Sequence, residues 1–139
     1  MLRDRRVHVT LPTQDLAVAR AFWEDRLGFE PFEVRSAAIL YRAGEGTLFA
    51  ASRTAARASG SHTQMAFTVP DIEAEVRELR AAGIEFEAYD YPTLRTVDGI
   101  AELAGVGLAA WFKDPDGNLI GLVQFAAGER QPPSIFDPR

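Results

Sequence analysis

Residues 7–16 read Val-His-Val-Thr-Leu-Pro-Thr-Gln-Asp-Leu, and residues 63–72 read Thr-Gln-Met-Ala-Phe-Thr-Val-Pro-Asp-Ile, the same pattern 56 positions later. In both stretches an alternating, strand-like run leads to an aspartate, Asp15 or Asp71, that is placed to cap a helix. A pattern repeated at a fixed offset indicates two copies of one structural unit. The chain is therefore predicted to contain two modules that each begin with a strand and a helix.

Apolar residues at helical spacing predict the two helices. They are Leu16, Ala19, Trp23 and Leu27 in the first copy and Ile72, Val76 and Leu79 in the second. Each helix is expected to end at a glycine, Gly28 or Gly83, because glycine readily takes the left-handed conformation found at helix ends. Extended segments follow at residues 29–33, 37–42 and 47–52, and again at 84–87, 108–113 and 119–125. The predicted fold class is α+β, with two βαβββ modules that pack as one domain.

The repeat also sets the boundaries within this single domain. They are about 6–52 for module one, 53–61 for the linker, 62–126 for module two and 127–139 for a C-terminal tail. Residues 88–106 lengthen the second copy and are expected to form a long loop, either a lid, a binding loop or a disordered segment. The tail carries the apolar pair Ile135-Phe136, so it is expected either to dock on the body or a partner chain or to be disordered.

Composition excludes several classes of function. The chain has 139 residues, a net charge of −5, no cysteine and two histidines. The acidic balance argues against a nucleic-acid partner. The missing cysteines remove disulfides, thiolate nucleophiles and cysteine-based metal sites, and two histidines cannot make a three-histidine metal centre. No stretch approaches the roughly 18 apolar residues of a membrane span, so the protein is expected to be soluble and cytoplasmic, with no membrane partner.

A more specific motif lies at residues 114–120, Asp-Pro-Asp-Gly-Asn-Leu-Ile, which reads as the turn of a last hairpin. Together with Ala-Phe-Trp at 21–23, Leu-Gly-Phe at 27–29 and the two repeated stretches, it resembles the vicinal oxygen chelate superfamily. That superfamily includes glyoxalase I, extradiol dioxygenases, fosfomycin-resistance enzymes and bleomycin-resistance proteins. The resemblance implies that the two modules form one curved mixed sheet of about eight strands around a cavity, with helices on the convex face.

The resemblance also implies four metal-ligand positions on the first and last strands of the modules. His8 matches the first of these positions. Gln64 stands where the second module usually has histidine, Gly121 where it usually has glutamate, and Phe49 or Ala50 at the remaining position. A divalent ion needs about three competent protein ligands. No cofactor is therefore expected, and a divalent metal is disfavoured although still possible.

His62 leaves a different metal set open, because His62 and Gln64 point the same way if the strand begins early enough. His8 and His62 would then share the cavity with a loop carboxylate, taken from Asp90, Asp98 or Glu102. The alternative is that His62 lies exposed at the strand entrance as a polar linker residue.

Strand alternation predicts which side chains face the cavity. The opposite face, expected to pack against the helix, carries Val7, Val9 and Leu11. One of Trp111 and Phe112 must face the cavity, and the pattern does not say which. Gly121 is expected to open volume for a bulky ligand. The complete set of predicted cavity residues is His8, Thr10, Phe49, His62, Gln64, Tyr91, Trp111 and Gly121.

The function predicted from this pattern is metal-independent binding of a small apolar or aromatic molecule, similar to the bleomycin-resistance proteins. The alternative is an enzyme, either a glyoxalase-type lyase or isomerase or a dioxygenase-like protein, with a non-standard metal set or with His8 as acid or base. A third hypothesis is a vestigial site in a protein that acts through association. Because members of the superfamily commonly pair modules between chains, a homodimer is expected.

Overall fold

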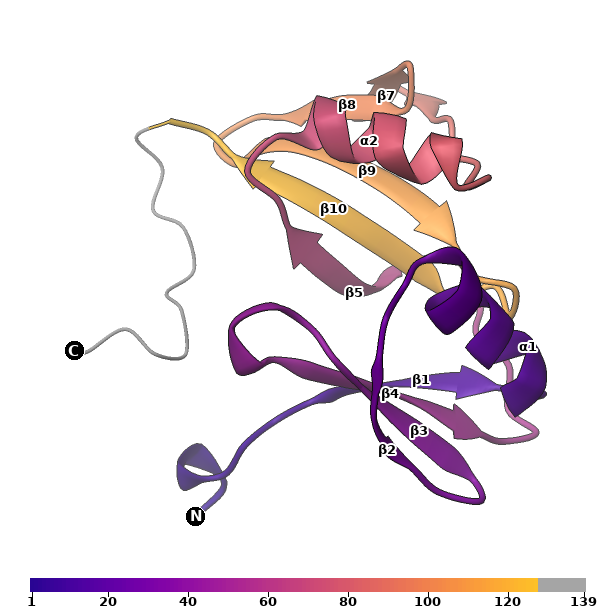
Figure 1. Ribbon diagram of the computed structural model, residues 1–139. Coiled ribbons are helices and arrows are strands. Elements are labelled where there is room, and N and C mark those ends of the chain that lie inside the picture. Colours follow the sequence, from indigo (N-terminus) through magenta and orange to yellow (C-terminus); the bar gives the residue numbers. More distant parts are fainter. Residues whose placement is uncertain (128–139) are drawn as a thin grey trace. The chain divides into compact units, whose positions relative to one another are not determined.

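The computed structural model describes residues 1–127. The chain divides into two compact units, Met1–Arg57 and a second unit that begins at Ala58. Hydrogen bonding gives each unit its own sheet, with four strands in the first and six in the second (Figure 1). The predicted α+β class with two modules is confirmed.

The first unit follows the predicted order of elements closely. Its elements are η1 (Leu2–Asp4), β1 (Val9–Thr13), α1 (Leu16–Arg20), the π-helical η2 (Ala21–Arg26), β2 (Pro31–Val34), β3 (Ala38–Arg42), η3 (Gly44–Gly46) and β4 (Leu48–Arg53). The strands lie in the order β1-β4-β3-β2, and only the β1–β4 pair is parallel. The Asp15 carboxylate caps α1 by accepting the N–H of Ala17 at 2.9 Å, and Gly28 has the left-handed φ of 76°.

Aromatic rings fill the core of the first unit. The Trp23 ring lies 4.8 Å from that of Phe49 and 5.6 Å from that of Phe29, both edge to face. Tyr41 is fully buried, and its hydroxyl donates to Glu24 at 2.8 Å, while Arg20 donates to both carboxylate oxygens of Glu24. These contacts fix η2 against the sheet.

The second unit has a longer sheet. Its elements are β5 (Thr63–Thr68), α2 (Ile72–Ala81), β6 (Asp90–Tyr91), β7 (Leu94–Val97), β8 (Ile100–Leu103), β9 (Gly107–Lys113) and β10 (Leu119–Phe125). The strand order is β5-β10-β9-β8-β7-β6, and α2 lies over β9 and β10 (Figure 1). Asp71 caps α2 by accepting the N–H of Ala74 at 3.2 Å, and Gly83 ends it with a φ of 89°.

The prediction of a long loop over residues 88–106 is wrong, because this segment forms β6, β7 and β8. Asp98 and Gly99 both have positive φ, 52° and 81°, which is the geometry of a two-residue hairpin turn between β7 and β8. The expected strand over 84–87 shrinks to a single bridge between Phe86 and Phe112, and β8 pairs with residues 107–109 of β9.

The motif at 114–118 is the turn that joins β9 to β10. The buried Asp114 carboxylate accepts from the backbone N–H groups of Asp116 and Asn118 and from the Asn118 side chain, at 2.7–3.0 Å. Burial raises the pKa of Asp114, and these hydrogen bonds oppose the shift. Hydrogen bonds between residues of the turn itself therefore stabilise it.

Within residues 1–127, no helix has both the length and the apolar character that a membrane crossing demands. The predicted C-terminal tail, with Ile135 and Phe136, lies outside the described residues apart from its first position.

Candidate functional site

Two candidates of the first module, His8 and Thr10, lie at an exposed strand entrance. His8 comes just before β1 and is exposed, and Thr10 on β1 is exposed as well. The expectation that Val7 packs against the helix is wrong, because the strand begins only at Val9 and the Val7 side chain is 92% exposed. Leu11 is fully buried as expected, whereas Val9 remains 37% exposed.

Phe49 does not belong to an open ligand-binding face. It is 2% exposed, and its ring contacts Trp23 at 4.8 Å, Phe29 at 5.2 Å and Tyr41 at 5.3 Å. The prediction that placed Phe49 in the cavity is corrected, because this side chain points to the helix side of its sheet. Its neighbour Ala50 is also buried and carries no ligand atom.

His62 precedes β5 and is exposed, which agrees with the alternative interpretation of this residue as a polar linker group at the strand entrance. Its Nδ1 lies 3.3 Å from the Ser59 hydroxyl. Gln64 sits where the β5–β10 register shifts, as the extra residue between the pairs Thr63–Leu119 and Met65–Ile120. The Gln64 Oε1 is buried and has no hydrogen-bond partner among the described residues.

The structure decides between Trp111 and Phe112. Phe112 is 1% exposed and packs 5.9 Å from Phe86, whose ring lies under the Arg80 guanidinium of α2. Side chains alternate along a strand, so Trp111 points to the opposite face of the sheet, away from α2. We call this the open face, and Trp111 is partly exposed on it.

Gly121 lies beside Trp111 on this face, paired with Trp111 across β9 and with Ala66 across β5. The space above Gly121 is not open, contrary to expectation. A Cβ atom there would lie 3.5 Å from Trp111 Nε1, 3.5 Å from the Ala66 Cβ and 3.3 Å from the Thr63 Cγ2. The indole crosses β10 over Gly121, and its N–H donates to the Thr63 hydroxyl at 3.0 Å.

Two further aromatic side chains, Tyr89 and Tyr91, continue the surface that begins at Trp111. We call Trp111, Tyr89 and Tyr91 the aromatic strip. Tyr89 meets Trp111 edge to face at 5.6 Å and stacks on Tyr91 at 6.1 Å. Tyr91 is 58% exposed. Burial raises the pKa of Tyr89, and the nearby Glu87 carboxylate adds to the effect. The phenol is therefore a neutral hydrogen-bonding group at ordinary pH.

Sequence reasoning missed Tyr89 as a site residue. The available signal was alternation, because Glu87, Tyr89 and Tyr91 are spaced by two and face one side of an extended segment. Tyr89 is held by a reciprocal contact with Thr96 on β7, whose hydroxyl accepts the Tyr89 N–H at 2.9 Å. Beside the strip, Glu87 pairs with Lys113 at 3.2 Å.

The residues at the implied metal positions do not fit a divalent cation. Gly121 has no side-chain donor and the direction of its missing side chain is filled by Trp111, while Phe49 and Ala50 offer no ligand atom. Over residues 1–127, no three histidine, aspartate or glutamate side chains are grouped so that they could hold a metal. Of the loop carboxylates, Asp90 pairs with Arg95 at 3.3 Å, and Asp98 and Glu102 are exposed.

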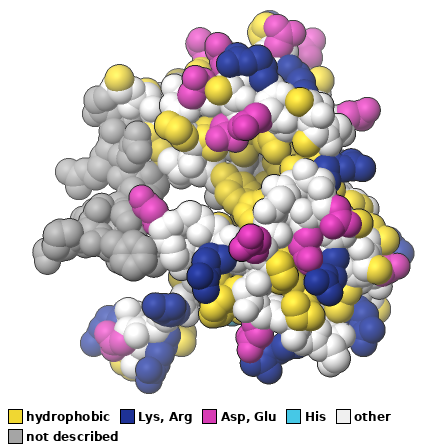
Figure 2. Space-filling view, in the orientation of Figure 1, with side chains coloured by type: hydrophobic (Ala, Val, Ile, Leu, Met, Phe, Trp, Pro, Cys, Tyr) yellow, Lys and Arg dark blue, Asp and Glu magenta, His cyan; other side chains and the backbone are white. Residues whose placement is uncertain are grey.

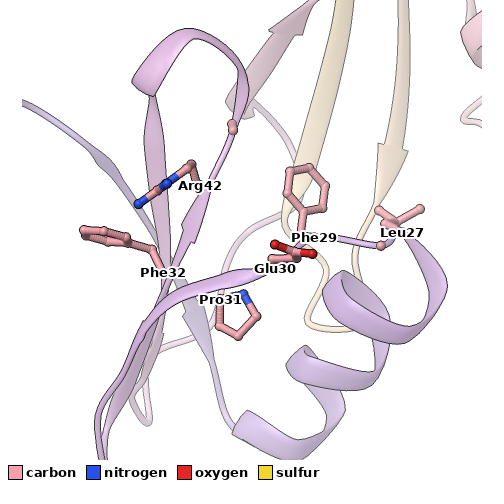
Figure 3. A pocket seen from close by; sticks show the side chains of 8 residues that line it. Leu27, Phe29, Glu30, Pro31, Phe32 and Arg42 are labelled. Atoms are coloured by element: carbon pink, nitrogen blue, oxygen red, sulfur yellow. The ribbon is translucent and has the colours of Figure 1, made fainter.

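A separate groove of about 550 Å³ lies within the first unit (Figure 3). It is lined by Leu27, Gly28, Phe29, Glu30, Pro31, Phe32, Arg42 and Ala43. The Arg42 guanidinium lies over the Phe32 ring at 4.7 Å, so this cation already has an aromatic partner. Sequence reasoning did not predict this groove.

Acidic and basic side chains are interspersed on the face of the molecule shown in Figure 2. The ion pairs of the described residues include Glu33 with Arg35 at 2.7 Å. Exposed pairs of this kind contribute little to stability. This face therefore presents no field of one sign to a charged ligand.

Comparison with solved structures finds the same fold in several proteins. TnmS3, an antibiotic binding protein from Streptomyces sp. CB03234, has a TM-score of 0.62 and 22% identity over 88% of this chain and 97% of its own. The bleomycin-binding protein in complex with bleomycin has a TM-score of 0.67 and 20% identity, covering 88% and 99%. The fosfomycin resistance protein FosX from Listeria monocytogenes has a TM-score of 0.66 and 20% identity, covering 91% and 98%.

A comparison with curated proteins finds no match. One family model matches residues 5–122, which is most of the chain and includes both copies of the repeat. The chain therefore belongs to the Glyoxalase/Bleomycin resistance protein/Dioxygenase superfamily.

Proposed function

We propose that this protein binds a small apolar or aromatic molecule without a metal, and that the ligand lies on the open face of the six-stranded sheet. The observation that carries the proposal is the aromatic strip. Its rings are partly exposed, held in a fixed order by ring contacts, and placed on the sheet face that α2 does not cover. Aromatic side chains arranged in this way offer a large apolar contact area at little conformational cost.

The surroundings of the strip favour an uncharged ligand. Thr63, Ala66 and Thr68 of β5 are exposed on the same face, beside the indole that covers Gly121 of β10. These side chains are small and uncharged, so a flat molecule can approach the backbone closely. The charges of Glu87 and Lys113 at the edge are paired with each other.

The donor set supports metal independence. The metal-dependent reactions of this superfamily polarise substrate oxygens with a bound cation, and such a cation needs about three protein ligands. Here the four implied positions hold one exposed histidine, one carboxamide and two residues without a donor. Similar folds include an antibiotic binding protein and a bleomycin-binding protein in complex with bleomycin, which supports ligand binding as the function.

A thermal-shift screen of metal-free protein against small molecules tests the proposal. We expect planar apolar compounds to raise the melting temperature of the wild type, because a ligand that binds only the folded state stabilises it. Trp111→Ala is expected to lose the shift. Phe32→Ala is the matched control, since it removes an aromatic ring that is 51% exposed in the groove of the first unit.

Two results contradict the proposal. One is a screen in which every compound raises the melting temperature only after a divalent metal is added. The other is a shift that survives Trp111→Ala but disappears in Phe32→Ala, which would move the ligand to the groove.

We also infer that the protein forms a homodimer. The support is apolar surface in the N-terminal segment of the first unit, where Leu2 is 88% and Val7 is 92% exposed. Large apolar side chains exposed to this degree are available to an interaction surface. Sedimentation equilibrium at micromolar concentration is expected to give twice the chain mass of 15.3 kDa, and a species of 15.3 kDa would contradict the inference.

A further inference from the structure

The path of the Trp111 side chain is unusual for a residue in the middle of a sheet. Trp111 is on β9 and Thr63 is on β5, with β10 between the two strands. Neighbouring strands lie about 4.8 Å apart, so a hydrogen bond between the two side chains requires the indole to lie across β10. It does so directly above Gly121, where any side chain would meet Nε1 at about van der Waals distance, 3.5 Å for a Cβ.

This arrangement determines which parts of the indole a ligand can use. Indole has a single donor, the Nε1–H, and no acceptor. That donor is already bound to the Thr63 hydroxyl at 3.0 Å, and Tyr89 meets the ring edge to face. What remains for contact is the part of the indole π surface that stays exposed. Such a surface stacks on flat aromatic rings far better than on puckered aliphatic ones.

We propose that Thr63 and Gly121 are positioning residues that hold the Trp111 indole across β10, and that the resulting aromatic platform selects planar, uncharged ring systems. The inference rests on the proposed function, since it names the ligand class of the same site. Thr63 fixes the indole by accepting its proton, and Gly121 leaves the room in which the ring lies. Both act on the ligand through Trp111.

The same glycine links the platform to the missing metal site. The superfamily resemblance puts a glutamate ligand at position 121, and in this chain the indole occupies the direction in which that side chain would project. A glutamate side chain at 121 and the indole in this position therefore exclude each other. One residue thus removes a metal ligand and makes an aromatic platform possible.

The test uses the full-length protein with Thr63→Val, which removes the acceptor at nearly constant shape, and Thr63→Ser, which keeps it. The indole N–H signal of Trp111 is assigned in the proton–nitrogen correlation spectrum as the one that is missing from the spectrum of Trp111→Phe. In Thr63→Val we expect this signal to move upfield and tryptophan emission to become more accessible to acrylamide, because the indole N–H loses its acceptor. Thr63→Ser is expected to keep both properties of the wild type.

Acridone, a planar tricyclic ketone, is the binding probe, and dicyclohexyl ketone, with the same number of carbons, is the non-planar control. The wild type is expected to bind acridone and not the control. Thr63→Val is expected to weaken acridone binding about three- to tenfold, the usual effect of one hydrogen bond, and Thr63→Ser to restore it. Gly121→Glu is expected to displace the indole signal and lose acridone binding.

Four outcomes overturn the inference. The first is a Thr63→Val variant that keeps both the Trp111 signal and the acridone affinity of the wild type. The second is equal binding of the two ketones by the wild type, and the third is no binding of acridone by the wild type. The fourth is a Gly121→Glu variant whose Trp111 signal stays in place. Failure of the proposed function is a different result, since it appears as a wild type that no compound in the thermal-shift screen stabilises.

Discussion

Substitution of Gly121 by residues of increasing size tests the packing above β10 quantitatively. An alanine Cβ would lie 3.3 Å from the Thr63 Cγ2 and 3.5 Å from both the Ala66 Cβ and Trp111 Nε1. Only the contact with Thr63 is tight, and that side chain is exposed and can shift by a few tenths of an ångström. Glycine in a strand costs roughly 0.5–1 kcal/mol relative to alanine, which offsets the crowding. We expect the free energy of unfolding of Gly121→Ala to lie within about 0.5 kcal/mol of the wild-type value.

A phenylalanine side chain at position 121 does not fit beneath the indole, so in Gly121→Phe the indole must leave its place over β10. Overpacking of this kind costs about 1–3 kcal/mol, and loss of the bond from Trp111 to Thr63 adds about 1 kcal/mol. We therefore expect a decrease of about 2–4 kcal/mol in the free energy of unfolding, with loss of ligand binding. The Ala variant is expected to keep the ligand.

Urea denaturation followed by circular dichroism measures both free energies, and the indole signal of Trp111 reports whether the ring has moved. A Gly121→Phe variant with wild-type stability and an unshifted Trp111 signal would refute the reasoning, because it would show that the space above Gly121 is empty. Equal destabilisation by Ala and Phe would also refute it, since the cost would then not depend on the size of the added group.

Three further predictions concern the rest of the molecule. Tyr41→Phe should lower the free energy of unfolding by about 1.5–3 kcal/mol at pH 7, because Tyr41 is fully buried and donates to the Glu24 carboxylate. The hydrogen bonds from Arg20 and then Tyr41 hold the pKa of Glu24 below its usual value of 4.5. The stabilisation by ionised Glu24 is therefore fully present above pH 4.5 and is lost as the pH falls through the lowered pKa. Urea titrations at pH 7 and pH 3 measure this difference. Gly99→Ala should cost roughly 1–2 kcal/mol in the same assay, since Gly99 has a φ of 81° and a Cβ there would lie 2.9 Å from the Arg80 guanidinium; wild-type stability would contradict this. Elemental analysis after dialysis against zinc, nickel, manganese and iron should find less than about a tenth of an equivalent of metal, and near-stoichiometric metal would contradict the ligand assignment.

The repeated strand–helix pattern was visible in the sequence because its signals are local. Asp15 and Asp71 cap their helices through contacts two or three residues away, and the glycine at each helix end takes its left-handed conformation regardless of the rest of the fold. The hairpin at Asp98-Gly99 was equally local. The sequence pattern nevertheless predicts a loop there, because the strands beside the turn are short and β6 has only two residues.

The site was harder to predict, because it depends on pairings between strands distant in sequence. Alternation alone left Trp111 and Phe112 undecided, and only the contact of Phe112 with Phe86 settles their faces. The bond from Trp111 to Thr63 joins residues 48 positions apart across a third strand. Nothing local indicates that an indole will cover Gly121, so the sequence suggested an open space there.

The most direct test of the central claim is a titration of metal-free protein with the compound that gives the largest shift in the thermal screen, followed by the two tryptophan indole signals in the proton–nitrogen spectrum. Trp111 lies on the open face, whereas Trp23 is 1% exposed in the core of the first unit. We predict that the Trp111 signal moves saturably with ligand concentration while the Trp23 signal stays in place. A Trp111 signal that does not respond, or that responds only after a divalent metal is added, would contradict metal-independent binding at the aromatic strip.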